Sequence, residues 1–402
     1  MPFRKIINDP VYGFITIDDE LINRVIVHPY FQRLRRINQM AMANLVYPGA
    51  VHSRLHHALG AYHLMCSALQ ELKSKGVDIS PAEEQGARIA ILLHDTGHGP
   101  FSHALEHVLI EGMHHEKISL MIMHELNKQF DGQLQLALDI FTDQYPKKFL
   151  YQLISGQLDV DRMDYLTRDS FFTGVSEGVI GYDRIIKMLA VHKGELVVEE
   201  KGIYSIEKFL IARRLMYWQV YLHKTGVAAE QMLIHTLQRA RELALEGVRL
   251  EAPRHLAWFL YRDNSGKIEP IESLFHFALL DDNDVTAAIK YWSEADDFTL
   301  SFLSKSLLDR HLFRLEWHNR QVPADYRDAL RARVRQVLGE QAIPEHFVYT
   351  GSESNRAYDD AADQIRILFK SGEVLPITEC SDVPPYTQIV TKHFICYPKK
   401  LT

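Results

Sequence analysis

The stretch LLHDTGHGPFSH, residues 92–103, places three histidines and an aspartate directly after the apolar run ARIAILL. Its glycines and proline predict a turn that ends one helix and begins another. Burying the adjacent pair His94 and Asp95 costs free energy unless both side chains find partners. A divalent cation is one such partner, since a neutral imidazole and a carboxylate are both good ligands. The alternative at this point is a core histidine hydrogen-bonded to its own neighbour.

Two other segments offer ligands for the same ion. His57 lies in RLHHALG, on a preceding predicted helix that we expect to pack antiparallel to the helix ending near His94. The segment LDVDRMDYLTRD, residues 158–169, places polar side chains at the spacing of one helical face. These are Asp161, Asp164, Tyr165, Arg168 and Asp169. A solvated face has the same spacing, but the segment lacks a full apolar stripe, which favours a face turned towards a cavity.

Composition places the chain among ordinary globular proteins. It has 402 residues, 47% of them hydrophobic and 24% charged, which is enough to bury a large core. The net charge of −7 argues against a chain-wide nucleic-acid-binding surface. Three cysteines without CxxC spacing predict a reducing compartment, with neither a disulfide framework nor a thiolate zinc site. We recognise no signal peptide and no membrane-spanning run, so we expect a cytoplasmic protein without membrane contact.

Hydrophobic periodicity predicts a mainly α fold. We expect a strand or hairpin in INDPVYGFITI, a helix ending at Gly76, and a helix starting at Ser80 and Pro81. Further helices are predicted at about 103–111, 115–126, 131–139, 147–155 and 158–169. A β-hairpin around Lys201 and Gly202 and a long helical region interrupted at Gly226 follow. The tail segments HFVYTG, IRILFK and TQIVTKHFICYP indicate strands, and hence a small α/β C-terminal subdomain.

Six motifs in a fixed order carry a resemblance to a known family. INDPVYGFI, FQRLRRINQ, VYPGAVHSRLHHALG, LLHDTGHGPFSH, HHEK and LDVDRMDYLTRD occur in the order seen in the HD-domain metal-dependent phosphohydrolases. The chain closely resembles the deoxynucleoside triphosphate triphosphohydrolases of the SAM-and-HD-domain type and their bacterial relatives. The resemblance covers about residues 4–240 and implies a helical HD-domain core.

The resemblance implies a metal centre with catalytic groups beside it. One divalent ion would be held by His57, His94, Asp95 and Asp161. These ligand types leave the ion open between Fe, Mn, Ni, Zn and Mg. The catalytic residues implied are His98, His103, Glu106 and His115. His98 would contact phosphate, and His103 would lie beside the bond that breaks, as an acid for the leaving oxygen. Relatives carry aspartate where Glu106 stands, which makes its supporting role less direct.

The resemblance also implies a substrate site for a deoxynucleoside triphosphate. Its residues would be Gln39, Arg54, Arg162, Tyr165, Asp169, Arg213, Tyr217, Tyr221 and Lys224. Gln39 would bond the 3′-hydroxyl, and Tyr165 would pack under the sugar and exclude a 2′-hydroxyl. The segment from Arg213 to Lys224 would present one helical face to phosphate and sugar, although an ordinary amphipathic helix has the same pattern.

A regulatory role is expected at the N-terminus. Residues that match the family's activator site are Lys5, Asn8, Gln32 and Arg35. Val27 stands where a guanine-reading aspartate would be, so the activator would be another nucleotide, or none. We expect residues 1–50 to form regulatory or oligomer contacts, residues 51–240 the HD catalytic core, and residues 241–402 a helical region with the α/β subdomain. By resemblance, the chain would assemble as a dimer or tetramer.

The expected reaction converts a deoxynucleoside triphosphate and water into deoxynucleoside and inorganic triphosphate. One rival is an HD phosphohydrolase acting on nucleoside monophosphates or other phosphoesters. A second rival is a non-catalytic nucleotide-sensing scaffold, against which the complete ligand set argues. Nucleic-acid binding is the least favoured function because the chain is acidic overall.

Overall fold

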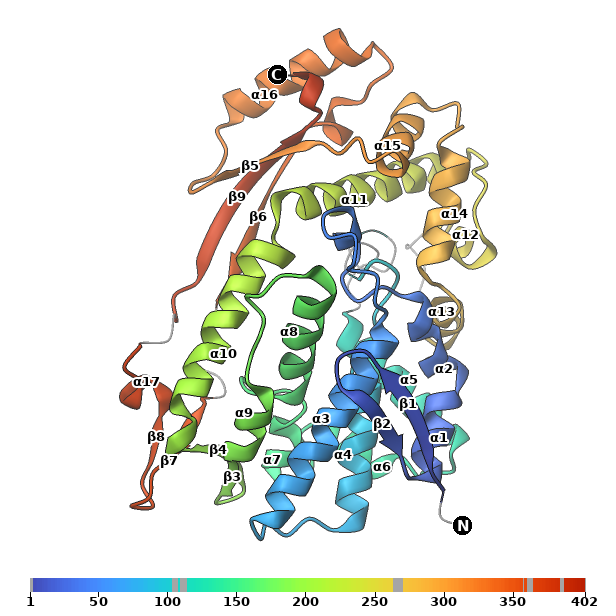
Figure 1. The fold of residues 1–402 in the computed structure, drawn as a ribbon. Coiled ribbons are helices and arrows are strands. Elements are labelled where there is room, and N and C mark those ends of the chain that lie inside the picture. Colours follow the sequence, from blue (N-terminus) through green and yellow to red (C-terminus); the bar gives the residue numbers. More distant parts are fainter. Residues whose placement is uncertain are drawn as a thin grey trace.

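The computed structural model of the chain is mainly helical, as predicted. It describes residues 3–102, 108, 114–262, 270–356, 358–359, 364–383 and 387–401. A body of packed helices fills the lower part of Figure 1, and the long helix α11 (Lys224–Leu245) runs across its top. Further helices and a sheet lie beyond α11. None of the described helices combines the length and the apolar character needed to cross a bilayer.

Three helices form the centre of the body: α3 (Arg54–Ser74), α4 (Pro81–Leu93) and α8 (Val160–Thr173). Helix α3 packs against both of the others, and it is buried along most of its length. The predicted ends are confirmed. Gly76, with a φ of 84°, follows α3, and Ser80 caps α4 by accepting a hydrogen bond from the backbone nitrogen of Glu83. The helix that carries His94 therefore starts at a well-defined residue.

The remaining helices of the body surround this centre. They are α1 (Glu20–Val27), α2 (Pro29–Gln32), α5 (His115–Gln129), α6 (Gln135–Phe141), α7 (Lys148–Gln152), α9 (Tyr182–Met188) and α10 (Ile203–Met216). The helices predicted at 115–126, 131–139, 147–155 and 158–169 correspond to α5, α6, α7 and α8, with ends that differ by a few residues. The helix predicted at about 103–111 falls almost entirely outside the described residues.

The predicted N-terminal hairpin is confirmed as β1 (Lys5–Asp9) and β2 (Gly13–Ile17). The two strands pair antiparallel, with Ile7 opposite Ile15. Asp9 forms the turn, because its Oδ1 accepts hydrogen bonds from the backbone nitrogens of Val11 and Tyr12. In Figure 1 the hairpin lies across the front of α3.

The second hairpin was predicted at the wrong turn. It consists of β3 (Leu189–His192) and β4 (Glu195–Glu199), and its turn residues are Lys193 and Gly194. Both have positive φ values, 52° and 84°, which suit a tight two-residue turn. The expected turn at Lys201 and Gly202 instead forms a short 3₁₀ segment that leads into α10. The strand order of this sheet is β3-β4-β7-β8, with β7 (Arg366–Leu368) and β8 (Val374–Pro376) coming from the C-terminal part of the chain.

The long helical region also breaks at a different place from the prediction. Helix α10 continues into a π-helical turn, η4 (Tyr217–Tyr221), and α11 begins at Lys224 after a cap by His223. Gly226 lies inside the first turn of α11 and does not interrupt it. This change of helical register decides which side chains of the region face the cavity described below.

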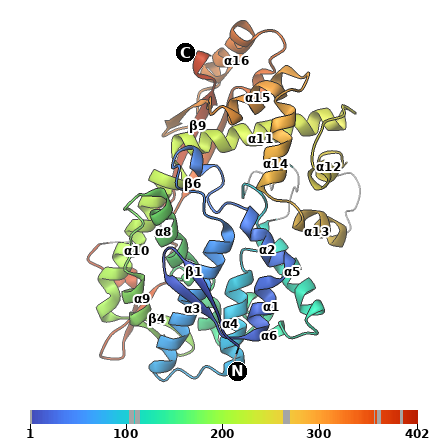
Figure 2. The same ribbon diagram turned by 45° about the vertical axis from the view of Figure 1, so that its right-hand side comes forward.

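The C-terminal part contains more helices and a three-stranded sheet, and the sheet lies in the upper part of Figures 1 and 2. The helices are α12 (Arg254–Leu260), α13 (Pro270–Ala278), α14 (Asp282–Trp292), α15 (Phe298–Leu308), α16 (Ala324–Leu338) and α17 (Ile377–Cys380). The sheet has the order β5-β9-β6, formed by β5 (Arg314–His318), β9 (Val390–Tyr397) and β6 (Tyr349–Asn355). The three tail strands are thus confirmed, but β7 joins the sheet of the second hairpin. The predicted domain limits remain a prediction.

Candidate active site

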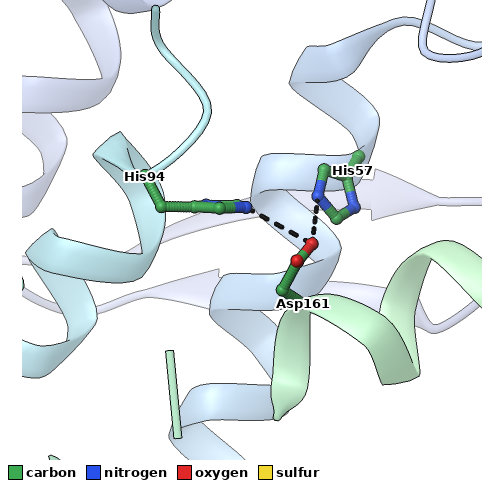
Figure 3. Close-up of side chains that lie close together, drawn as sticks. All are labelled: His57, His94 and Asp161. Atoms are coloured by element: carbon green, nitrogen blue, oxygen red, sulfur yellow. Dashed lines mark ion pairs between the residues drawn. The ribbon is translucent and has the colours of Figure 1, made fainter. Parts of the chain in front are cut away.

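Three side chains from separate helices converge on one point. His57 comes from α3, His94 follows the last residue of α4, and Asp161 lies in the first turn of α8. Figure 3 shows both imidazoles pointing at the same carboxylate oxygen. Asp161 Oδ1 lies 3.0 Å from His57 Nε2 and 3.4 Å from His94 Nε2. All three ligand atoms lie within 4.8 Å of one another, a spacing that suits a single metal ion.

The opposite nitrogen of each imidazole has a partner that fixes the ring. His57 Nδ1 lies 2.7 Å from Asp164 Oδ2, and His94 Nδ1 lies 2.6 Å from the carbonyl oxygen of Ile91. Such contacts select the tautomer in which Nε2 carries a free lone pair, as metal-bound histidines require. Both Nε2 atoms are buried and make no hydrogen bond within the described part of the chain. Two orphaned acceptors beside a carboxylate fit a divalent cation.

Asp95, the fourth predicted ligand, borders the same point but has a second partner. Its oxygens lie 3.7 Å from His57 Nε2 and 3.4 Å from His94 Nε2. Asp95 Oδ2 also accepts a hydrogen bond of 2.6 Å from Arg54 Nη1. Burial alone would raise the pKa of Asp95, but two neighbouring histidines and Arg54 hold that pKa well below its usual range. Asp95 is therefore anionic and ready to share a cation.

The turn that follows Asp95 is held against helix α5. Ser119 Oγ donates to the carbonyl oxygen of His94 and accepts from the backbone nitrogen of Gly97. A Cβ atom at Gly97 would lie 2.0 Å from the carbonyl oxygen of His115. Only glycine allows this approach between two backbones. The predicted turn at the end of α4 is thus confirmed, and its glycine sets the distance between residues 94–98 and α5; the helix predicted to begin after the turn lies almost entirely outside the described residues.

Two of the predicted catalytic histidines are stacked on each other. The rings of His98 and His115 have centroids 3.9 Å apart and an angle of 16° between their planes. Burial, followed by the nearby Arg54, lowers the pKa of His98 to about 3, so its imidazole is neutral at physiological pH. Both rings line the cavity described next. His103 and Glu106, the other two predicted catalytic residues, lie outside the described residues.

A cavity of about 610 Å³ opens beside the three converging ligands. Ligand sites in proteins typically measure about 300–1,000 Å³, so this one has room for a nucleotide. Predicted site residues that line it are Gln39, Arg54, Asp95, His98, His115, Asp161, Arg162, Tyr165, Asp169, Tyr217 and Tyr221. Residues that sequence analysis did not single out include Glu230 and Gln231 from α11 and Glu353 from β6. The C-terminal part of the chain thus contributes to the cavity wall.

One wall of the cavity is formed by two tyrosine rings, Tyr165 and Tyr221, and by Asp169, which is held by hydrogen bonds. Asp169 Oδ2 accepts from the hydroxyl of Tyr221 at 2.8 Å, and Asp169 Oδ1 lies 2.7 Å from His52 Nε2. The ring of Tyr165 stands edge-on to that of Tyr221, with centroids 6.1 Å apart. His52 was missed in the sequence, although its position two residues before Arg54 is a signal that could have found it. Its contact holds Asp169 in place.

The polar face predicted on α8 divides between two environments. Asp161, Tyr165 and Asp169 line the cavity, as expected. Asp164 and Arg168 are fully buried and form an ion pair with each other against α3. The reason is the close contact of α8 with α3, since side chains at these two positions point at the neighbouring helix and not at the cavity.

The predicted cationic residues also divide. Arg162 lines the cavity, but its guanidinium binds Asp159 and the carbonyl oxygen of Gly156. Arg213 donates to Gln157 Oε1 at 3.3 Å, and Lys224 is exposed at the start of α11. Neither Arg213 nor Lys224 is among the cavity-lining residues. The single helical face expected from Arg213 to Lys224 does not form, because the π-helical turn and the break after it change the register.

The four predicted activator residues form two separate groups. Arg35 Nε donates to Gln32 Oε1 at 2.7 Å, whereas Lys5 and Asn8 lie exposed on β1. Among the described residues, no hydrogen bond or ion pair joins the two groups. An activator site at these positions stays a prediction.

Comparison with known proteins agrees with this geometry. The family model described as HD domain matches residues 54–169, and the one described as HD associated region matches residues 180–253. A phosphohydrolase structure from Bacteroides thetaiotaomicron is 50% identical, with a TM-score of 0.95 over 98% of this chain and 100% of that one. The protein YwfO of Bacillus subtilis is 31% identical over 99% of this chain and 93% of its own length. This chain belongs to the HD-domain phosphohydrolase family.

Several of the similar proteins carry names that state an activity. One of them is the Dictyostelium discoideum protein named deoxynucleoside triphosphate triphosphohydrolase SAMHD1 homolog, which is 30% identical over 62% of this chain. The matched region spans 52% of that relative's own length. The HD domain match begins at Arg54 and ends at Asp169, so it includes all four candidate metal ligands. The chain is accordingly an HD-domain hydrolase.

Proposed function

We propose that this chain hydrolyses deoxynucleoside triphosphates to deoxynucleoside and inorganic triphosphate. The observation that carries the proposal is that two different groups face one cavity. Asp161 of the metal-ligand cluster lines the cavity together with Asp95, and Tyr165, Asp169 and Tyr221 line the same cavity. The metal ligands suit a phosphate, and the tyrosines with Asp169 suit a sugar. Because the two sets of residues adjoin, the cavity can bind the adjoining phosphate and sugar of a nucleotide.

The metal site is proposed to consist of His57, His94, Asp95 and Asp161. Two imidazoles and two carboxylates bind several first-row divalent metals and leave coordination positions open for other oxygen ligands. A divalent ion held there lowers the pKa of water and neutralises charge on phosphoryl oxygens. The carboxylates suit this role, as do the buried Nε2 atoms of His57 and His94, which have no hydrogen-bond partner among the described residues.

The sugar is proposed to lie between Gln39 and Tyr165. Gln39 lines the cavity, and its Oε1 is a buried acceptor that has no hydrogen-bond partner in the part of the chain that the structure describes. It can accept a hydrogen bond from a 3′-hydroxyl, and Asp169 can accept a second one. The Tyr165 ring beside them would occupy the space that a 2′-hydroxyl needs. A site built in this way favours deoxyribose over ribose.

The phosphates are proposed to lie towards Arg54 and His98. Arg54 is a guanidinium buried at the cavity wall, and it brings positive charge to an acidic protein. The neutral His98 imidazole can donate a hydrogen bond to a phosphate oxygen. In the reaction, water attacks the α-phosphorus, the bond from that phosphorus to O5′ breaks, and O5′ leaves with a proton. The predicted donor of this proton is His103.

The relatives support this choice over other phosphoesters. Three of the similar proteins, from Dictyostelium discoideum, chicken and human, are named deoxynucleoside triphosphate triphosphohydrolases, with identities of 29–30%. A monophosphate would leave a large part of the 610 Å³ cavity unfilled. We therefore favour the triphosphate.

The test is a substrate panel with product identification. The purified chain is loaded in turn with Fe²⁺, Mn²⁺, Ni²⁺, Zn²⁺ or Mg²⁺, each preparation is incubated with one dNTP, NTP or dNMP at a time, and the products are identified by ³¹P NMR. We expect intact inorganic triphosphate from dNTPs alone. An Asp161→Asn preparation controls for contaminating phosphatases. Orthophosphate from dNMPs would establish the rival reaction, and no hydrolysis with any divalent metal would contradict both.

A further inference from the structure

A chain of buried charged groups leads away from the candidate metal ligand His57. Asp164 Oδ2 lies 2.7 Å from His57 Nδ1 and accepts from Arg168 Nε at 3.0 Å. Arg168 Nη1 in turn donates to Asp9 Oδ2 at 2.8 Å. Asp164 and Arg168 are completely inaccessible to solvent, and the side chain of Asp9 is only 3% exposed. The metal site is thus linked to the turn of the N-terminal hairpin through two successive ion pairs.

Arg168 binds both carboxylates through a fork of nitrogens. Its Nη2 lies 3.0 Å from Asp164 Oδ1 and 3.3 Å from Asp9 Oδ1, in addition to the bonds from Nε and Nη1. Bidentate contacts of this kind fix orientation as well as distance. The guanidinium is covered by the ring of Tyr12, whose centroid lies 5.4 Å from Cζ. The geometry leaves Arg168 little freedom to exchange one partner for another.

The backbone of α3 is adapted to this ion pair. A Cβ atom at Gly60 would lie 2.0 Å from Asp164 Oδ1 and 2.1 Å from Arg168 Nη2. Gly60 lies one helical turn from His57 on the same helix, so the pair rests directly on the element that carries the ligand. Any residue with a Cβ atom at position 60 would collide with this ion pair, so the sequence of α3 is adapted to it.

Asp9 has two tasks. Its Oδ1 accepts from the backbone nitrogens of Val11 and Tyr12, which forms the hairpin turn, and more weakly from Arg168 Nη2 at 3.3 Å. Its Oδ2 accepts the shorter bond from Arg168 Nη1. The negative charge of Asp9 offsets part of the positive charge that the guanidinium presents to Asp164. Without that charge, Arg168 draws more strongly on Asp164, and the carboxylate's hold on the His57 Nδ1 hydrogen weakens.

We propose that Asp9 is a positioning residue for the metal ligand His57, acting through Arg168 and Asp164. The N-terminal hairpin is then part of the metal site's support and not only a candidate surface for regulation. The inference rests on the proposed metal site. It adds a contribution from a residue that touches neither metal nor substrate.

The test uses Asp9→Asn, which keeps an oxygen for the turn but removes the charge facing Arg168. The matched control is Asp19→Asn, because Asp19 also caps a backbone nitrogen, that of Ile22, and lies on a different network. Mn²⁺ affinity is measured by calorimetry on metal-free protein. Removing an outer partner of a ligating histidine typically weakens metal binding about 10- to 100-fold. Asp9 reaches His57 only through Arg168 and Asp164, so for Asp9→Asn we expect the Mn²⁺ affinity to fall by the lower figure, about tenfold. Asp19→Asn should bind Mn²⁺ like the wild type.

A second readout needs no metal. The ¹⁵N chemical shifts of His57 report how much hydrogen remains on Nδ1, and Asp9→Asn should shift them while Asp19→Asn does not. If Asp9→Asn does not fold, Asp9→Ser, whose hydroxyl can still accept from the turn, carries the same expectations. Unchanged Mn²⁺ affinity and unchanged His57 shifts would overturn the inference. A wild type that binds no divalent ion would instead refute the metal site itself, so the two failures are distinguishable.

Discussion

Arg54 Nη1 lies 2.6 Å from Asp95 Oδ2, and Arg54 Nη2 lies 2.7 Å from Ser102 Oγ. One guanidinium therefore joins the candidate metal ligand to the far end of the turn that follows it. Ser102 and its neighbour Phe101 have positive φ values of 55° and 50°, which are unusual for residues other than glycine. Arg54 thus helps to hold a strained segment in place while presenting its charge to the cavity.

Replacing Arg54 should reduce activity, less in a lysine variant than in an alanine variant. Arg54→Lys keeps the charge but cannot make both bonds, and Arg54→Ala loses both bonds and the charge. Removing one preorganised donor typically costs about 10²–10³ in rate, so we expect kcat/KM for a dNTP to fall about tenfold in the lysine variant and about hundredfold or more in the alanine variant. Steady-state kinetics measures both. A lysine variant at the wild-type rate would show that the fork is unimportant.

Removing the Tyr165 ring should relax the choice of sugar. Tyr165→Ala opens space beside the proposed ribose, so the ratio of kcat/KM for dATP over ATP should fall at least tenfold, corresponding to about 1.4 kcal/mol of discrimination. Tyr165→Phe keeps the ring and serves as the control, and it should retain the discrimination. Equal ratios in the wild type and the alanine variant would contradict the placement of the sugar.

Adding one methyl group at Gly97 should damage the fold of the site. The added Cβ would meet backbone atoms of His115 and Ser119 at 2.0 and 2.3 Å, and these cannot rotate away. Overpacking of this kind costs about 1–3 kcal/mol, which urea unfolding of Gly97→Ala would measure. Gly226→Ala is the matched control. Its Cβ would meet nothing within 4 Å and lies in a helix, so the change should stabilise the protein by about 0.5–1 kcal/mol.

His235 should make stability depend on pH, away from the metal site. Burial, followed by the charges of His346 and Arg331, lowers the pKa of His235 to about 3. The unfolded chain takes up this proton below its ordinary pKa of about 6.5, but the folded protein does not, so folding is weakened as the pH falls from about 6.5 towards 3.

The size of this effect follows from the uptake of one proton. The free energy of unfolding should fall by about 1.4 kcal/mol per pH unit from this group, and His235→Gln should lack that component. Urea unfolding at pH 7, 6 and 5 measures the difference between the two proteins. The exposed His311→Gln variant should follow the wild type. A constant gap between His235→Gln and the wild type across this range would show that His235 is protonated normally.

Local signals explain what could be predicted from the sequence. Gly76 marks the end of one helix and Ser80 the start of the next, and both predictions are confirmed. The spacing of Asp161, Tyr165 and Asp169 follows from one helical period, so these three were correctly placed on the cavity side. The three side chains that converge, His57, His94 and Asp161, are all among the metal ligands predicted from the sequence.

What was missed depends on contacts between distant residues. Asp164 and Arg168 have the same helical spacing as the cavity residues, and only the packing of α3 and the hairpin shows that they face inward. The π-helical turn at Tyr217–Tyr221 shifts the helical register after Arg213, and no local sequence pattern predicts this turn. The alternating apolar residues around Lys201 and Gly202 predict the hairpin turn there, whereas the turn is formed by Lys193 and Gly194, both of which adopt a positive φ.

The most direct measurement is the metal content of the wild type against Asp161→Asn, with Asp309→Asn as a control at an exposed position. After saturation with Mn²⁺ and removal of free ion, mass spectrometry gives the number of ions per chain. We expect about one ion per chain in the wild type and in Asp309→Asn, and a loss of at least about 90% in Asp161→Asn. Removing even an outer partner of a ligand typically weakens metal binding about 10- to 100-fold, and loss of a direct ligand should cost at least as much. Equal metal content in all three proteins would contradict the assignment of His57, His94 and Asp161 as the metal centre.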